Sequence, residues 1–145
     1  MTVLIRPPAR LIYLSSGLHN SGRDALDDID WTTRRWNGTQ AYCDSKLYVT
    51  TLAPAIADRW PTVHSNAVDP GWVPTRMGGH SATDDLRLGQ LTQVWLATSN
   101  DATAAMIGGY WHHQRTVRPA AAASDDRFQE QLVDELGRIT GEPLP

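Results

Sequence analysis

Residues 10–16, Arg-Leu-Ile-Tyr-Leu-Ser-Ser, form a short apolar run that ends in two small polar residues. A run of this length and composition predicts a buried strand. A second run, residues 62–68, is followed by Asp-Pro-Gly at 69–71, and a third candidate strand covers residues 104–111. Segments with helical periodicity separate the three runs. The sequence therefore predicts an α/β fold with a parallel sheet.

The segments between and after these runs have the spacing of amphipathic helices. One helix is expected to begin near Thr39 and to be kinked at Pro54, whose ring removes an intrahelical bond. Another covers about residues 83–98, and a last one is expected to have Ser124 as its N-cap and to end at Gly141. About three strands with flanking helices amount to half of a doubly wound, Rossmann-type sheet. We therefore expect a single partial domain over residues 1–145.

Composition excludes several classes of protein. A chain of 145 residues that is 41% hydrophobic and 20% charged is typical of one globular domain. It contains no apolar run long enough for a membrane span, and residues 1–8 are too short and too early broken by proline for a secretory signal. A net charge of -3 argues against a non-specific nucleic-acid binder. We expect a cytoplasmic protein without bound nucleic acid or a membrane span.

Several polar features predict structure rather than chemistry. Residues 17–38 form a polar connection whose acidic patch we interpret as a solvated loop, with Asp24, Asp27, Asp28 and Asp30. Residues 72–84 are also expected to form a loop. Cys43 is the single cysteine, which we expect to be a buried small residue. Adjacent His112 and His113 would point to opposite faces of a strand, so no metal site is expected there.

Tyr42 and Lys46 are the first candidates for catalysis. Twelve of the thirteen basic residues are arginines, and Lys46 is the single lysine. Because the two residues are four apart on a predicted helix, their side chains share one face. A phenol has a pKa near about 10, and a neighbouring ammonium favours its ionised form. The pair therefore predicts a general acid/base.

Two further features lie where strands of an α/β fold end, the place at which such folds bind ligands. Ser16 follows the first strand, and its hydroxyl is suited to orient a carbonyl oxygen. Pro70 and Gly71 follow the second strand, and a glycine there lets the backbone approach a flat ligand closely. Each feature alone is common in proteins. Their order along consecutive strand–helix units makes the combination specific.

These residues resemble the short-chain dehydrogenase/reductases. The resemblance rests on Leu-Ser-Ser at 14–16, Ala-Tyr-Cys-Asp-Ser-Lys-Leu at 41–47 and Asn-Ala-Val-Asp-Pro-Gly-Trp-Val-Pro-Thr at 66–75. Similarity to the retinol-dehydrogenase-like branch rests on Ser-Gly-Leu-His at 16–19, Gly-Gly-Tyr at 108–110 and Leu-Gly-Arg-Ile-Thr-Gly at 136–141. The resemblance implies an NAD(P)-dependent oxidoreductase that transfers hydride between nicotinamide and a small-molecule carbonyl or alcohol.

The resemblance also implies roles for individual residues. Ser16 would orient the substrate, Tyr42 would exchange the proton, and Lys46 would lower the pKa of Tyr42 and bind the nicotinamide ribose. A further set would line the nicotinamide: Pro70, Gly71, Val73 and Thr75. Residues 76–87 would form a mobile lid. Whether the cofactor is NAD or NADP is left open.

The chain departs from this family in one large respect. The glycine-rich turn that seats a dinucleotide pyrophosphate at a helix N-terminus is not found before Ser16. Residues 1–5 resemble the tail of the helix that precedes the serine-bearing strand. We therefore expect the C-terminal half of such an enzyme, with the nucleotide-binding half missing. Three alternatives stay open: a non-catalytic remnant, a subunit that completes its sheet with another chain or in a homo-oligomer, and a small-molecule-binding domain without redox chemistry.

Overall fold

The computed structural model describes residues 9–144, and its centre is a four-stranded sheet in the order β1-β2-β3-β4. The strands are β1 (Arg10–Leu14), β2 (His64–Asp69), β3 (Tyr110–His112) and β4 (Arg115–Thr116). The first three are parallel, and β4 is antiparallel to β3. The prediction of an α/β fold with three parallel strands is confirmed. The third strand is shorter than expected, β4 was not expected, and the expected helix tail at residues 1–5 lies outside the described residues.

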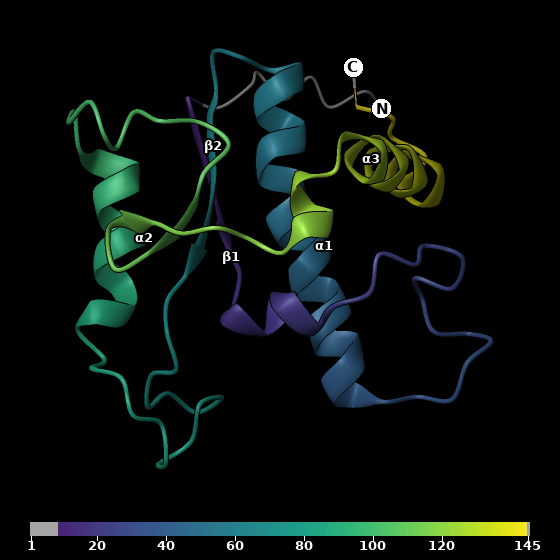
Figure 1. The fold of residues 1–145 in the computed structure, drawn as a ribbon, viewed down its shortest axis with the longest axis horizontal. Coiled ribbons are helices and arrows are strands. Elements are labelled where there is room, and N and C mark those ends of the chain that lie inside the picture. The colour runs from purple at the N-terminus through teal and green to yellow at the C-terminus, as the bar shows by residue number, and fades with distance from the viewer. Residues whose placement is uncertain (1–8, 145) are drawn as a thin grey trace.

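The helices cover both faces of this sheet. They are η1 (Gly17–Ser21), α1 (Gly38–Arg59), α2 (Leu88–Thr98), η2 (Ala121–Ser124) and α3 (Asp126–Thr140). In Figure 1, β1 and β2 run between α2 on one side and α1 with α3 on the other. Pro54 lies inside α1, which continues to Arg59. No helix in the described part of the chain is both long and apolar enough to cross a membrane.

The ends of α3 test two capping predictions. Its N-cap is Asp125 rather than Ser124, because the Asp125 carboxylate accepts the Phe128 N–H at 2.8 Å. Ser124 belongs instead to η2. Gly141 caps the other end in the left-handed conformation, as expected.

The core lies in separate clusters on the two faces of the sheet. Between α1 and α3, Leu47 and Leu132 are almost fully buried. On the α2 face, Leu96 packs with Val68 and Trp111. The second cluster fixes α2 against the strands, and Ala53 of α1 packs on Ala67 and Tyr110 of the strands, so the carboxyl ends of β1 and β2 are held at one edge of the sheet.

Asn66 joins β2 to the segment before β3. Its Oδ1 accepts the Gly109 N–H at 3.0 Å and the Trp111 Nε1–H at 2.9 Å, and its Nδ2 donates to the Met106 carbonyl at 2.8 Å. The side chain is 1% exposed. Asn66 therefore satisfies three polar groups at once, including the buried Trp111 indole N–H, which explains an amide side chain inside a parallel strand.

One edge of the sheet is open. β1 pairs with β2 in the register Arg10↔His64 to Leu14↔Val68, and within residues 9–144 its other edge has no strand partner. All residues of β1 are at least partly exposed, whereas four of the six residues of β2 are buried. Parallel strands are ordinarily covered on both sides and both faces. In the described part of the chain, β1 is thus an edge strand at a position where a parallel sheet ordinarily has a further strand.

Candidate active site

Tyr42 and Lys46 lie together at the carboxyl end of β1. The Lys46 ammonium donates a hydrogen bond to the Leu14 carbonyl at 2.9 Å. The same nitrogen lies 5.5 Å from the centroid of the Tyr42 ring. Both side chains are half-buried. The structure therefore brings the expected pair together and places it beside the last residue of β1.

The two serines after β1 have different surroundings. Ser15 is buried, and its Oγ lies 2.6 Å from the Thr50 Oγ1, so the Ser15 hydroxyl is already hydrogen-bonded to a side chain of α1. Ser16 is half-buried, and its Oγ accepts the Leu18 N–H at 3.3 Å. This leaves the hydroxyl hydrogen of Ser16 free to donate to another group. The role of Ser16 stays a prediction, but Ser16 is the serine whose hydrogen is available.

Pro70 and Gly71 lie at the same edge as Ser16. The Ser15 N–H donates to the Val68 carbonyl at 2.7 Å, which continues the pairing of β1 with β2 to the point where both strands end. Gly71 has φ +83, a conformation that favours glycine, and a Cβ there would collide with the Asp84 carboxylate. The group that the Gly71 backbone approaches closely is thus the Asp84 side chain in the following loop.

Val73 and Thr75 make their contacts within that loop and α2. The Val73 side chain packs against Gly89, where a Cβ would meet Val73 Cγ1 at 2.9 Å. The Thr75 N–H donates to the Val73 carbonyl at 2.7 Å, and the Thr75 Oγ1 accepts the Gly78 N–H at 3.1 Å. These contacts do not themselves join Val73 or Thr75 to the Tyr42–Lys46 pair, so their proposed place beside a nicotinamide stays a prediction.

The loop after β2 is closed at its base by Asp84. The Asp84 carboxylate accepts the Trp72 N–H at 2.6 Å, and the Asp84 N–H donates to the Trp72 carbonyl at 3.0 Å. Residues 76–87 contain no helix or strand, and most of them are exposed. This arrangement is compatible with the expected lid, which remains a prediction.

Burial distinguishes the other tyrosines from Tyr42. Burial raises the pKa of Tyr13, and it raises the pKa of Tyr48 to about 12, helped by the Asp44 charge. Burial and the Asp69 carboxylate also raise the pKa of Tyr110. These three phenols are poor proton donors and acceptors near neutral pH. Tyr42 is the tyrosine that has an ammonium beside its ring.

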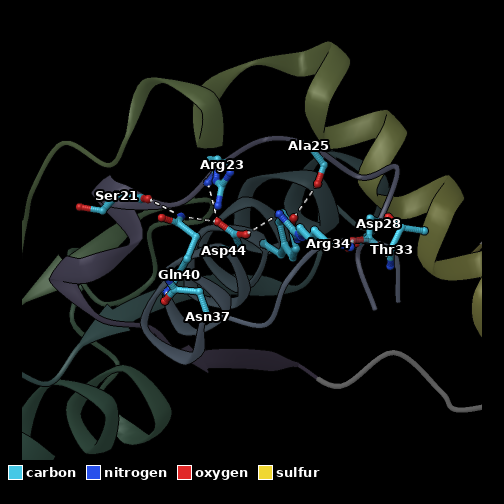
Figure 2. A network of polar contacts seen from close by, with 10 residues as sticks. Ser21, Arg23, Ala25, Asp28, Thr33, Arg34, Asn37, Gln40 and Asp44 are labelled. Atoms are coloured by element: carbon cyan, nitrogen blue, oxygen red, sulfur yellow. Dashed lines mark hydrogen bonds and ion pairs between the residues drawn. The ribbon is translucent and has the colours of Figure 1, made fainter. Parts of the chain in front are cut away.

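A buried ionic network holds the polar segment 22–37 against α1 (Figure 2). Asp44 is 1% exposed, and its Oδ1 accepts hydrogen bonds from the Arg23 N–H at 2.9 Å and the Gln40 Nε2 at 2.7 Å. Its Oδ2 lies 3.4 Å from the Arg34 Nη1. Asp44 is two positions from both Tyr42 and Lys46, so it occupies a different face of α1. The network fixes the helix turn that carries the candidate pair.

Asp28 belongs to the same network, which corrects the interpretation of the acidic patch as uniformly solvated. It is 8% exposed, and its carboxylate accepts the Thr33 N–H at 2.9 Å and the Arg34 N–H at 3.1 Å. Burial acts to raise the pKa of Asp28, but these backbone hydrogen bonds outweigh it and hold the pKa below its usual value. The other members of the patch, Asp24, Asp27 and Asp30, are exposed as expected.

Replacing Arg34 with methionine is expected to lower the free energy of unfolding by about 3 kcal/mol, because the buried Asp44 carboxylate loses its ion pair. Urea unfolding of the purified chain measures the loss. Arg35→Met is the matched control, since Arg35 is the exposed neighbour, and it should change the value by less than about 0.5 kcal/mol. Equal effects of the two substitutions would contradict a stabilising ion pair at Arg34.

The adjacent histidines differ from the expectation. His112 ends β3, but His113 has φ 47 and lies in the turn to β4, so the rings do not point to opposite faces of a strand. Their centroids are 3.8 Å apart. Among residues 9–144, no group of three or more histidine, cysteine or acidic side chains could hold a metal ion. Cys43 is buried, as expected.

Comparison with known proteins places the chain in a family. No protein-family profile matches it. It is 36% identical to the short-chain dehydrogenase chry4 of Gibberella zeae, over 98% of this chain and 56% of that protein. It is 35% identical to the short-chain dehydrogenase chyC of Penicillium rubens, over 100% of this chain and 57% of that protein. The chain belongs to the short-chain dehydrogenase/reductase family.

A further similar protein and a solved structure with the same fold cover comparable shares of this chain. Human retinol dehydrogenase 13 is 29% identical over 95% of this chain and 47% of its own length. A crystal structure of an uncharacterized protein from Mycobacterium paratuberculosis shares the fold, with a TM-score of 0.77 at 20% identity, over 94% of this chain and 52% of that one. This short-chain dehydrogenase/reductase chain thus spans about half the length of the relatives it matches, which is consistent with the expected C-terminal half.

Proposed function

We propose that the chain is the catalytic part of an NAD(P)-dependent oxidoreductase that acts on a carbonyl or alcohol substrate. The observation that carries the proposal is the position of the Lys46 ammonium. It is held by the Leu14 carbonyl and lies beside the Tyr42 ring, at the edge of the sheet from which Ser16 emerges. Membership of the short-chain dehydrogenase/reductase family supports the same reaction class.

In the proposed reaction each residue has a separate task. The Ser16 hydroxyl donates a hydrogen bond to the substrate oxygen and fixes its direction. The Tyr42 hydroxyl gives a proton to that oxygen during reduction and removes it during oxidation. Lys46 holds a positive charge beside the Tyr42 ring, with its Nζ 5.5 Å from the ring centroid. The nicotinamide supplies or accepts the hydride, and the protein orients and tunes the reaction.

The residues present fit one end of a dinucleotide. Lys46 uses one of its three N–H groups on the Leu14 carbonyl, and the Tyr42 hydroxyl has no hydrogen-bond partner among residues 9–144. Both groups are therefore able to bind the hydroxyls of a nicotinamide ribose. The described residues contain no glycine-rich turn between a strand and a helix for the pyrophosphate. The fit covers the nicotinamide end alone.

The direct test is a hydride-transfer assay with the purified chain. Each of NADH and NADPH is combined with a panel of aldehydes and ketones, and the consumption of reduced nicotinamide is followed by its absorbance. We expect substrate-dependent consumption with one of the two cofactors. A chain that unfolds cooperatively, and hence is folded, but consumes neither cofactor would contradict the proposed activity of this polypeptide.

The open edge of β1 supports a second candidate function, that of a subunit that completes its sheet with another chain. An unpaired strand edge exposes backbone N–H and C=O groups that pair readily with a further strand. The α2 helix adds apolar side chains that are exposed on the described part of the chain, namely Leu88, Leu91 and Val94. Exposed apolar side chains are a further feature that another chain would cover.

Light scattering and thermal unfolding of the purified chain test this second function. A chain that relies on a partner is expected to be oligomeric, aggregation-prone or without a cooperative transition when it is alone. A monodisperse monomer that melts cooperatively would contradict a need for another chain. That result would leave the hydride-transfer proposal intact, so the two experiments separate the two functions.

A further inference from the structure

His19 is a buried polar side chain next to the candidate site, and the proposed reaction does not use it directly. It lies in η1, three residues after Ser16, and is 0% exposed. Its Nδ1 lies 2.8 Å from the Ser16 carbonyl oxygen, and its Nε2 lies 2.9 Å from the backbone nitrogen of Ala120. His19 thus connects the end of β1 with the residue that precedes η2.

These two contacts fix the tautomer of the imidazole. The Ala120 N–H can only donate, so Nε2 must accept and carries no hydrogen. The Ser16 carbonyl can only accept, so Nδ1 must carry the hydrogen. The neutral Nδ1–H form satisfies both contacts. An imidazolium would direct an N–H of its own against the Ala120 N–H.

The surroundings of His19 favour this neutral form. Burial lowers the pKa of His19, although the Ser16 carbonyl and the Asp69 carboxylate act in the opposite direction. The Tyr110 ring lies against the imidazole with centroids 4.6 Å apart, and the pKa of this phenol is itself raised by burial and by Asp69. Asp69 is therefore the charged group that acts on the His19 ring, and its effect does not reverse that of burial.

The Ser16 carbonyl is held twice by the same residue. Besides the Nδ1 contact, it accepts the backbone N–H of His19 at 3.0 Å. Both lone pairs of this oxygen are used, so the Ser16 peptide group cannot rotate without breaking two hydrogen bonds. Because the backbone sets the direction of the Cα–Cβ bond, these bonds fix the position from which the Ser16 hydroxyl extends, and the Leu18 N–H contact at 3.3 Å holds its Oγ.

We infer that His19 is a positioning residue for Ser16, in which the neutral imidazole joins the Ser16 carbonyl to the Ala120 amide and fixes the backbone that carries the hydroxyl. The effect on catalysis rests on the proposed role of Ser16 in substrate binding. The positioning of the Ser16 backbone does not rest on that role, and it can be measured without an activity assay.

The first experiment records the side-chain nitrogen resonances of ¹⁵N-histidine in the full chain near pH 7. We expect His19 to have the resonances of a protonated Nδ1 and an unprotonated Nε2, with the exposed His80 as an internal reference. A protonated Nε2 on His19, or a fully protonated ring, would overturn the inference. This measurement needs no variant and is therefore independent of any effect of mutation on folding.

The second experiment compares three substitutions that separate the two contacts. His19→Asn keeps an N–H donor for the Ser16 carbonyl, His19→Gln keeps an acceptor for the Ala120 N–H, and His19→Ala removes both. We expect the amide resonances of Ser16 to stay near their original positions in His19→Asn and to move in the other two. Hydrogen exchange at Ala120 should be about tenfold faster in His19→Asn and His19→Ala than in His19→Gln.

Equal displacement of the Ser16 resonances in His19→Asn and His19→Gln would overturn the positioning role, even if His19→Ala does not fold. In the hydride-transfer assay, His19→Ala should lower kcat by about 10- to 100-fold with unchanged nicotinamide affinity, and His19→Asn should restore most of it. An unchanged kcat in His19→Ala would overturn the catalytic consequence. If the original chain has no turnover while the resonance results hold, the proposed function fails and the positioning role stands.

Discussion

Replacing Tyr42 with phenylalanine is expected to lower turnover by about 1,000-fold, the scale on which general acid/base groups contribute. The substitution removes the hydroxyl that would exchange a proton with the substrate oxygen and keeps the ring beside Lys46. Affinity for the nicotinamide cofactor should fall much less than turnover, because Tyr42→Phe removes one of the two groups proposed to bind the ribose and leaves Lys46 with its hydrogen bond to Leu14. The hydride-transfer assay measures turnover, and a titration of tryptophan fluorescence measures cofactor affinity.

Tyr48→Phe is the matched control for this prediction. Tyr48 lies on the same helix, but its hydroxyl is buried and donates to the Ala25 carbonyl at 2.8 Å. Its loss should reduce stability slightly and leave turnover near its original value. Near-normal turnover in Tyr42→Phe, or an equal loss in both variants, would contradict the role proposed for Tyr42.

Lys46→Arg is also expected to cause a severe loss of turnover, because a planar guanidinium cannot occupy the place of a compact ammonium.

Local sequence patterns were sufficient to predict the elements that bring the candidate pair to the sheet edge. The apolar runs at 10–16 and 62–68 contain β1 and most of β2, and their parallel pairing follows from the helix between them. The spacing of Tyr42 and Lys46 is itself a helical property, so their shared face follows once the helix is assigned. Sequence patterns predict relations between residues that lie near each other in the chain. The shared helix face of Tyr42 and Lys46 is such a relation.

The contacts that sequence could not predict join distant parts of the chain. His19 and Ala120 are 101 residues apart, and a lone histidine in a polar segment gives no sign of its partner. Asp28 was grouped with exposed acidic neighbours because its burial depends on a turn at residues 28–34 whose Arg34 reaches Asp44 of α1 at 3.4 Å. The strand at 104–111 was overestimated because backbone pairing with β2 begins only near Gly109, where Asn66 holds the chain.

Asn66→Leu is expected to lower the free energy of unfolding by about 4 kcal/mol. Leucine has the same branched shape but cannot hydrogen-bond to the Gly109 N–H, the Trp111 indole N–H or the Met106 carbonyl, and an unsatisfied buried group such as the Trp111 indole costs about 1–3 kcal/mol. Asn66→Asp keeps an acceptor for the two N–H groups but puts a buried carboxylate oxygen against the Met106 carbonyl, so it should also lower the free energy of unfolding. Urea unfolding measures both changes.

The same substitution at an exposed asparagine, Asn100→Leu, separates the lost hydrogen bonds from the change of residue type, and it should alter stability by less than about 0.5 kcal/mol. Asn66 bonds to β3 and the segment before it, not to the candidate active site. Partial unfolding of β3 in Asn66→Leu should therefore appear first as faster hydrogen exchange at the Trp111 indole N–H. The Lys46 bond to Leu14 lies on the β1 side of the sheet and should persist. An Asn66→Leu chain as stable as Asn100→Leu would mean that the side-chain hydrogen bonds of Asn66 do not stabilise β3.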